Sequence, residues 1–131
     1  MGTRHDACTH VMSKNQVVDA VTNYLQKERY YVNRLNKSNE ADVMAANEYH
    51  TLYIEAEGNE EAAYSRKLEA DFSCQVMRLL KKYDKEPGRT LVLANPDTPF
   101  LRERASSLKD ALDQLEIVRF WVKKDGGVEW E

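Results

Sequence analysis

The sequence predicts a single α/β domain built around a mixed sheet, with helical and strand-like periodicities alternating along most of the chain. Three short strand-like runs follow one another across short turns, which favours an antiparallel meander. Two further strand-like runs are each preceded by a helical stretch, which is the connection that parallel strands need. The chain has 131 residues, so we expect one domain covering residues 1–131 with a core of its own.

The expected elements follow the order α-β-β-β-α-β-α-β, and a short last strand is possible at the end of the chain. Residues 1–12 carry no periodic pattern and are expected to be loose. The expected ranges are a helix at 14–27, strands at 30–36, 41–47 and 51–58, a long helix at 60–85, a strand at 90–96, a helix at 99–114, a strand at 117–123, and the short strand at 128–131.

Capping residues and apolar runs support several of these expected elements. Ser13 can cap the first helix together with Gln16, in the pattern of a capping box. The run "TLVLANP" is almost continuously apolar, which predicts a central strand buried on both faces. Thr98 or the preceding Asp97 can cap the following helix, which has Pro99 in its first turn.

Composition and charge make some classes of protein less favoured, but they do not identify a function. The formal net charge is -3 and the pI is about 5.7, so no overall basic field indicates nucleic acid, although a local basic patch is enough for binding. Cys8 and Cys74 have no disulfide or zinc spacing, and Cys74 is expected to be a small buried hydrophobe. With no signal peptide and no apolar run of membrane length, we expect a cytoplasmic protein without membrane contact.

Three carboxylates stand near strand ends in the stretch "ADVMAANEYHTLYIEAEGNEE". Asp42 starts the second expected strand, and Glu55 and Glu57 lie two apart on the third, so the two glutamates share one face. If the two strands pair as a hairpin, Asp42 lies near the end that carries the glutamates. Carboxylates crowded in apolar surroundings repel one another, and a divalent cation such as Mg²⁺ or Mn²⁺ relieves that repulsion. Such an ion supports phosphodiester hydrolysis.

These residues resemble the PD-(D/E)xK phosphodiesterase superfamily, which has the restriction-endonuclease-like fold. Asp42 in "ADVMA" matches the first acid of the motif, Glu55 in "IEAEG" matches the central acid, and the order of elements matches from about residue 13 to residue 122. The resemblance implies a restriction-endonuclease-like core and a metal-dependent nuclease. It implies Asp42, Glu55 and Glu57 as catalytic residues, and Asp42 and Glu55 as ligands of Mg²⁺ or Mn²⁺.

Glu57 stands where the superfamily usually has a lysine that orients or activates water. Three interpretations remain open. Some active members carry Glu at this place; alternatively, a cation comes from the long helix, with Arg66 and Lys67 as candidates; or the site has decayed and only the fold is retained.

Purely structural roles are also open for the three acids. Asp42 can cap a turn at the start of a strand. Glu55 and Glu57 can lie on the solvent face of an edge strand, in which case Ile54 and Ala56 form its buried face.

Further residues are weaker candidates. The resemblance suggests Asp19, Lys67 and Gln75 as residues that support the site, although a solvated Asp19 and a Gln75 at a helix boundary are ordinary. Possible phosphate contacts are Lys14, Arg78, Lys81 and Lys82. Cations also gather at helix C-termini through the helix dipole, which explains the last three without a ligand.

Three classes of function follow. The first is a Mg²⁺-dependent nuclease, with DNA as the expected partner and RNA as the alternative. The second is a catalytically inactive member of the same fold that binds nucleic acid or protein. The third is an assembly subunit, whose interface would include "VEWE" or Trp130. By analogy, a domain of this size works as a homodimer or with a larger partner.

Overall fold

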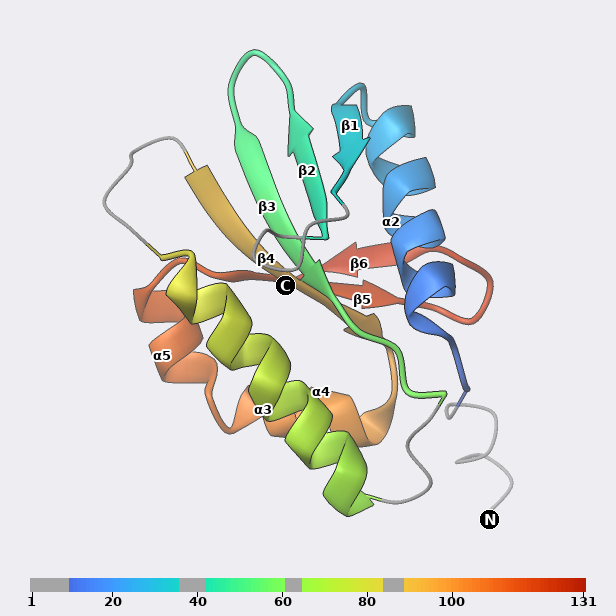
Figure 1. Cartoon of the computed structure of the whole chain (residues 1–131), viewed down its shortest axis with the longest axis vertical. Coiled ribbons are helices and arrows are strands. Elements are labelled where there is room, and N and C mark those ends of the chain that lie inside the picture. The colour runs from blue at the N-terminus through green and yellow to red at the C-terminus, as the bar shows by residue number, and fades with distance from the viewer. Residues whose placement is uncertain (1–9, 36–41, 61–64, 84–88) are drawn as a thin grey trace.

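A computed structural model describes residues 10–35, 42–60, 65–83 and 89–131. Within these residues, six strands form one mixed sheet in the order β1-β2-β3-β4-β5-β6 (Figure 1). The strands are β1 (Tyr31–Arg34), β2 (Val43–Ala46), β3 (Thr51–Ala56), β4 (Arg89–Pro96), β5 (Val118–Val122) and β6 (Val128–Trp130). The helices are α2 (Lys14–Lys27), α3 (Ser65–Lys81), α4 (Pro99–Ser106) and α5 (Lys109–Gln114).

The strand pairing agrees with the expected topology. Strands β1, β2 and β3 form an antiparallel meander, and β3, β4 and β5 are parallel neighbours. Strand β6 is present as well and pairs antiparallel with β5. The mixed α/β architecture with a parallel section is therefore confirmed.

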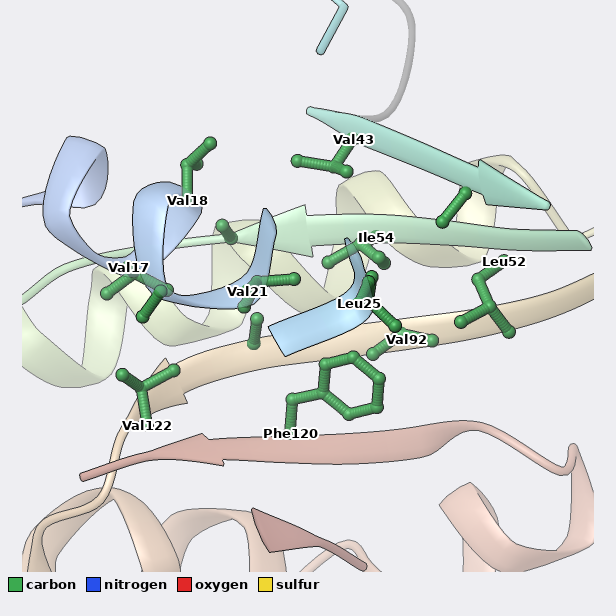
Figure 2. Close-up of a cluster of buried hydrophobic side chains, with 14 of the residues drawn as sticks. Val17, Val18, Val21, Leu25, Val43, Leu52, Ile54, Val92, Phe120 and Val122 are labelled. Atoms are coloured by element: carbon green, nitrogen blue, oxygen red, sulfur yellow. The ribbon is translucent and has the colours of Figure 1, made fainter. Parts of the chain in front are cut away.

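Helices cover both faces of the sheet and enclose two hydrophobic clusters of described residues. Helix α2 packs on one face, where Val17, Val21 and Leu25 meet Ile54 and Phe120 (Figure 2). Helices α3, α4 and α5 pack on the other face. Strand β4 contributes to both clusters: Val92 and Ala94 belong to the first, and Leu91 and Leu93 to the second. The strand is buried on both faces, as its continuous apolar run predicted.

The helix expected at 99–114 is wrong as a single element, because the structure has two helices there. Helix α4 ends at Ser106, and α5 begins at Lys109. The hydroxyl of Ser107 donates a hydrogen bond to the carbonyl oxygen of Arg104 at 2.7 Å. A serine that bonds the backbone in this way competes with helix continuation, which accounts for the break.

The expectation that Cys74 is buried is also wrong, since its side chain is exposed. Helix α3 turns Phe72, Gln75 and Leu79 toward the sheet, a spacing of three and four residues that defines one face. Cys74 and Met77 lie off this face, and Met77 is 58% exposed. The buried face of α3 is therefore rotated from the one that its apolar residues alone indicated.

The end of the segment that was expected to be loose is packed against the fold. Met12 is buried; its backbone N–H donates to Asn59 Oδ1 at 2.7 Å, and its carbonyl accepts from the Asn59 N–H at 2.9 Å. His10 is also buried, with Nε2 3.2 Å from the Val122 carbonyl oxygen. Residues 1–9, including Cys8, and the turn expected at 37–40 lie outside the described residues. No helix in the described parts of the chain is long and apolar enough to cross a membrane.

Candidate functional site

Glu55 is a buried carboxylate in the middle of the sheet. It lies on β3, which has β2 on one side and β4 on the other, and only 2% of its surface is exposed. Its neighbours Ile54 and Ala56 enter the cluster beneath α2, so Glu55 faces α3. The alternative of a glutamate on the solvent face of an edge strand is therefore excluded for Glu55.

Asp42 lies beside Glu55 at the end of the β2–β3 hairpin. Its backbone N–H donates to the Ile54 carbonyl at 3.0 Å, and its Oδ2 accepts from the Ala56 N–H at 2.9 Å. Its other oxygen, Oδ1, is 2.8 Å from Lys14 Nζ at the start of α2. Through Oδ2, Asp42 thus caps the end of β3 across the hairpin, and it also lies close to a second carboxylate.

Arg78 links the two glutamates. Its Nε donates to Glu55 Oε1 at 3.1 Å, and its Nη2 donates to Glu57 Oε2 at 3.4 Å. Glu57 lies one residue beyond β3, but its N–H still donates to the Ala94 carbonyl at 3.1 Å and continues the ladder toward β4. The glutamates accordingly share one face, as their spacing predicted.

The electrostatic setting disfavours the charged form of Glu55. Burial is the largest cause and raises the pKa of the Glu55 carboxyl, and the neighbouring Asp42 raises it further. The hydrogen bond and the charge of Arg78 oppose these effects, and Lys14 opposes them more weakly. The pKa remains above its ordinary value, so burial and the second carboxylate outweigh the two cations.

A buried amide pair holds α3 against this part of the sheet. Gln75 is fully buried, and its Nε2 donates to the Glu55 carbonyl at 3.0 Å, to the Ala94 carbonyl at 3.2 Å and to Asn95 Oδ1 at 3.2 Å. Asn95 Nδ2 returns a hydrogen bond to Gln75 Oε1 at 2.7 Å. Gln75 therefore supports the backbone beneath the site. Sequence reasoning missed Asn95, whose only signal is a polar residue inside "TLVLANP".

A hollow of about 240 Å³ opens beside Glu57. It is lined by Lys14, Glu57, Gly58, Glu60 and Asp71. The chain passes very close to itself here, because a Cβ added at Gly58 would clash with the Met12 carbonyl oxygen. Glycine at 58 thus allows the N-terminal segment to pack against the end of β3.

The other predicted residues have different partners. Asp19 pairs with Arg34 at 2.7 Å, and Lys67 pairs with Asp71 at 3.2 Å, one turn along the same helix. Lys81 is exposed on the last turn of α3, and Lys82 directly follows it. Arg78, predicted as a phosphate contact, forms the centre of the cluster with Glu55 and Glu57.

Asp42 and Glu55, the acids predicted as metal ligands, each pair with a cation in the structure, Asp42 with Lys14 and Glu55 with Arg78. Across the described ranges, no group of three or more His, Cys, Asp or Glu side chains forms a metal-binding cluster. Two carboxylates offer hard oxygen ligands of the kind that Mg²⁺ accepts, with water completing its shell. The site's acids and cations are Asp42, Glu55, Glu57, Lys14 and Arg78, which we call the carboxylate cluster.

Comparison with known proteins gives a relationship at the level of the fold. No protein-family model matches the sequence, and no curated protein matches it. The crystal structure of an XisH family protein from Nostoc punctiforme PCC 73102 is similar, with a TM-score of 0.59 and 13% sequence identity. The match covers 88% of this chain and 98% of that chain. At this identity the similarity concerns the fold alone.

Proposed function

We propose that this protein is a metal-dependent nuclease of the restriction-endonuclease-like class, which hydrolyses phosphodiester bonds of nucleic acid. The observation that carries the proposal is Glu55, a buried carboxylate with a raised pKa that lies next to Asp42 at the end of a central strand. Groups perturbed in this way concentrate at functional sites. The order of elements and the acids at 42 and 55 support the same class.

Asp42 and Glu55 would hold Mg²⁺ or Mn²⁺. The donor set fits, because both are carboxylates whose mutual repulsion a divalent cation would relieve. A bound ion of this kind polarises a phosphoryl oxygen and lowers the pKa of a coordinated water. Lys14, 45% exposed in its side chain, can contact a phosphate from the rim. Glu57 lines the adjacent hollow, where its carboxylate can accept a proton from water.

A second candidate is a catalytically inactive module that binds nucleic acid. The observation that favours it is the pairing of each acid with a cation: Asp42 with Lys14, and Glu55 with Arg78. Two internal cations can neutralise the acids without a metal. Glutamate at position 57, in place of the lysine of the superfamily, agrees with this candidate as well.

Cleavage assays with matched variants test the proposal. We expect Mg²⁺ or Mn²⁺ to support cleavage of plasmid, branched DNA or RNA, and we expect Asp42→Asn and Glu55→Gln each to lower the rate roughly 100-fold or more, since metal catalysis supplies several kcal/mol. Glu48→Gln is the control, because Glu48 is an exposed acid in the turn of the same hairpin. It should leave the rate unchanged.

The other outcomes separate the candidates. Thermal stabilisation by Mn²⁺ or binding of nucleic acid, without cleavage, contradicts the nuclease and supports the inactive module. Equal cleavage by wild type and both acid variants also contradicts the nuclease site. Failure to bind divalent ions or nucleic acid at low salt would leave an assembly role.

A further inference from the structure

Arg78 lies at the boundary between the buried acid and solvent. The side chain of Glu55 is 3% exposed and that of Glu57 is 26% exposed, whereas that of Arg78 is 37% exposed. The guanidinium contacts the glutamates through Nε and Nη2, and an arginine has further N–H donors. A cation in this position can bind the acids and an external anion at the same time.

We propose that Arg78 is the phosphate-binding residue of the site, supplying from helix α3 the positive charge that Glu57 does not supply from the strand. The proposal rests on the proposed function, because it places the substrate phosphate at the same carboxylate cluster. A guanidinium suits this role because its planar donors match phosphate oxygens and it remains charged throughout the working pH range.

The position of Arg78 is fixed by the helix that carries it. Gln75 lies one turn earlier on α3 and is bonded to the carbonyl oxygens of Glu55 and Ala94. This anchor sets the height of α3 above the end of β3, so Arg78 lies over the glutamates. By contrast, Lys67, one of the two cations considered from the sequence, is bonded to Asp71.

Arg78 also borders a second hollow, whose surface is mainly apolar. This hollow of about 350 Å³ is lined by Ser73, Cys74, Met77, Arg78 and Lys81. Lys81 belongs to the last turn of α3 and is exposed. Arg78 and Lys81 are the two cations that border this hollow, so a phosphate bound by Arg78 would have a second cation nearby.

The ion pair with Glu55 provides a test that needs neither metal nor cleavage. Replacing Glu55 with glutamine removes the buried counter-charge of Arg78, so Arg78 becomes more available to a phosphate. Replacing both residues with glutamine then removes the cation without leaving a buried, unpaired charge. Such a paired replacement is tolerated better than the loss of one partner.

The experiment measures binding of a fluorescein-labelled DNA duplex and of its single strand by anisotropy, in EDTA, as a function of salt. Loss of one phosphate contact lowers the slope of log affinity against log salt by about 0.9 for duplex and about 0.7 for single strands. We expect this decrease for Glu55→Gln/Arg78→Gln relative to Glu55→Gln. The Glu55→Gln/Arg78→Lys variant should retain the slope, because the charge is kept.

Lys124→Gln in the Glu55→Gln background is the matched control, because Lys124 is an exposed cation in the turn between β5 and β6. Urea unfolding of every variant verifies that it is folded. Equal slopes for Glu55→Gln and Glu55→Gln/Arg78→Gln would overturn the proposal, even if the wild type cleaves DNA. An equal decrease with Lys124→Gln would also overturn it, because it would indicate a general basic surface.

Cleavage is a separate outcome. A slope that decreases only with loss of Arg78, in a protein whose wild type does not cleave with Mg²⁺ or Mn²⁺, supports phosphate binding by Arg78 and contradicts the nuclease. The two proposals can therefore fail independently.

Discussion

Replacing Gln75 with leucine should destabilise the protein through the amide that it leaves behind. Leucine is close to glutamine in size, so the change removes hydrogen bonds and leaves little cavity. The change removes two hydrogen bonds of the Asn95 side-chain amide, which is 2% exposed and bonded to Gln75 through both its oxygen and its nitrogen. The Ala94 carbonyl keeps a partner, because it also accepts from the Glu57 N–H.

The expected magnitude follows from the two orphaned groups of Asn95. A buried donor or acceptor without a partner costs about 1–3 kcal/mol, so Gln75→Leu should lower the free energy of unfolding by about 2–6 kcal/mol. Asn95→Leu alone should cost less, because the Gln75 amide nitrogen keeps the carbonyls of Glu55 and Ala94. The double variant removes both polar partners, so its cost should fall below the sum of the single costs by about 0.5–3 kcal/mol.

Urea unfolding followed by tryptophan fluorescence measures these differences. Trp121 is 1% exposed and lies in the same cluster as Phe72 and Leu79 of α3, so its emission reports loss of this core. The dependence of the unfolding free energy on urea should not change among the variants. Strict additivity of the two single costs, or a cost of Gln75→Leu below the range for one orphaned group, would refute the reasoning.

Two more predictions concern backbone packing and pH. Gly58→Ala should lower the free energy of unfolding by about 1–3 kcal/mol and lower the melting temperature, because the added Cβ would press against backbone atoms of Met12 and Lys14. Gly127→Ala is the control, because a Cβ there meets only the Asp125 side chain, at 3.2 Å. Equal melting temperatures of the two variants would contradict the argument. Since the folded pKa of Glu55 is raised, its contribution to stability is present below the unfolded pKa and is lost as pH rises through the folded pKa. The difference in unfolding free energy between wild type and Glu55→Gln should follow that course in a urea series across pH, and a constant difference would refute it.

Sequence reasoning was most successful where local pattern decides the structure. The meander follows from short turns, and a hairpin places Asp42 near Glu55 whatever the rest of the fold does. The spacing of Glu55 and Glu57 placed them on one face for the same local reason. These features need no knowledge of how helices dock on the sheet.

Features that depend on how a helix packs on the sheet could not be predicted from the pattern of apolar residues. Apolar residues suggested that Cys74 faces inward, but the hydrogen bonds of Gln75 to the sheet set the rotation of α3 and turn Cys74 outward. That rotation also brings Arg78 over Glu55, a contact between residues 23 positions apart. Sequence reasoning named Gln75 and Arg78 separately, but only the docking of α3 brings both of them to Glu55, so the central cation could not be identified before the structure.

The stability of Glu55→Gln decides why the chain keeps an acid at this position. If the ion pair with Arg78 is present mainly to stabilise the fold, removing the acid at neutral pH should lower the free energy of unfolding, as loss of one partner of a buried pair usually does. The raised pKa argues the other way, because it means that the folded protein disfavours the ionised carboxylate even with Arg78 beside it. Glutamine resembles the protonated acid, so Glu55→Gln should match or exceed the wild type in stability at neutral pH. If Glu55→Gln abolishes function but keeps or raises the free energy of unfolding, Glu55 is present for its chemistry. If Glu55→Gln clearly lowers the free energy of unfolding, Glu55 is present to stabilise the fold.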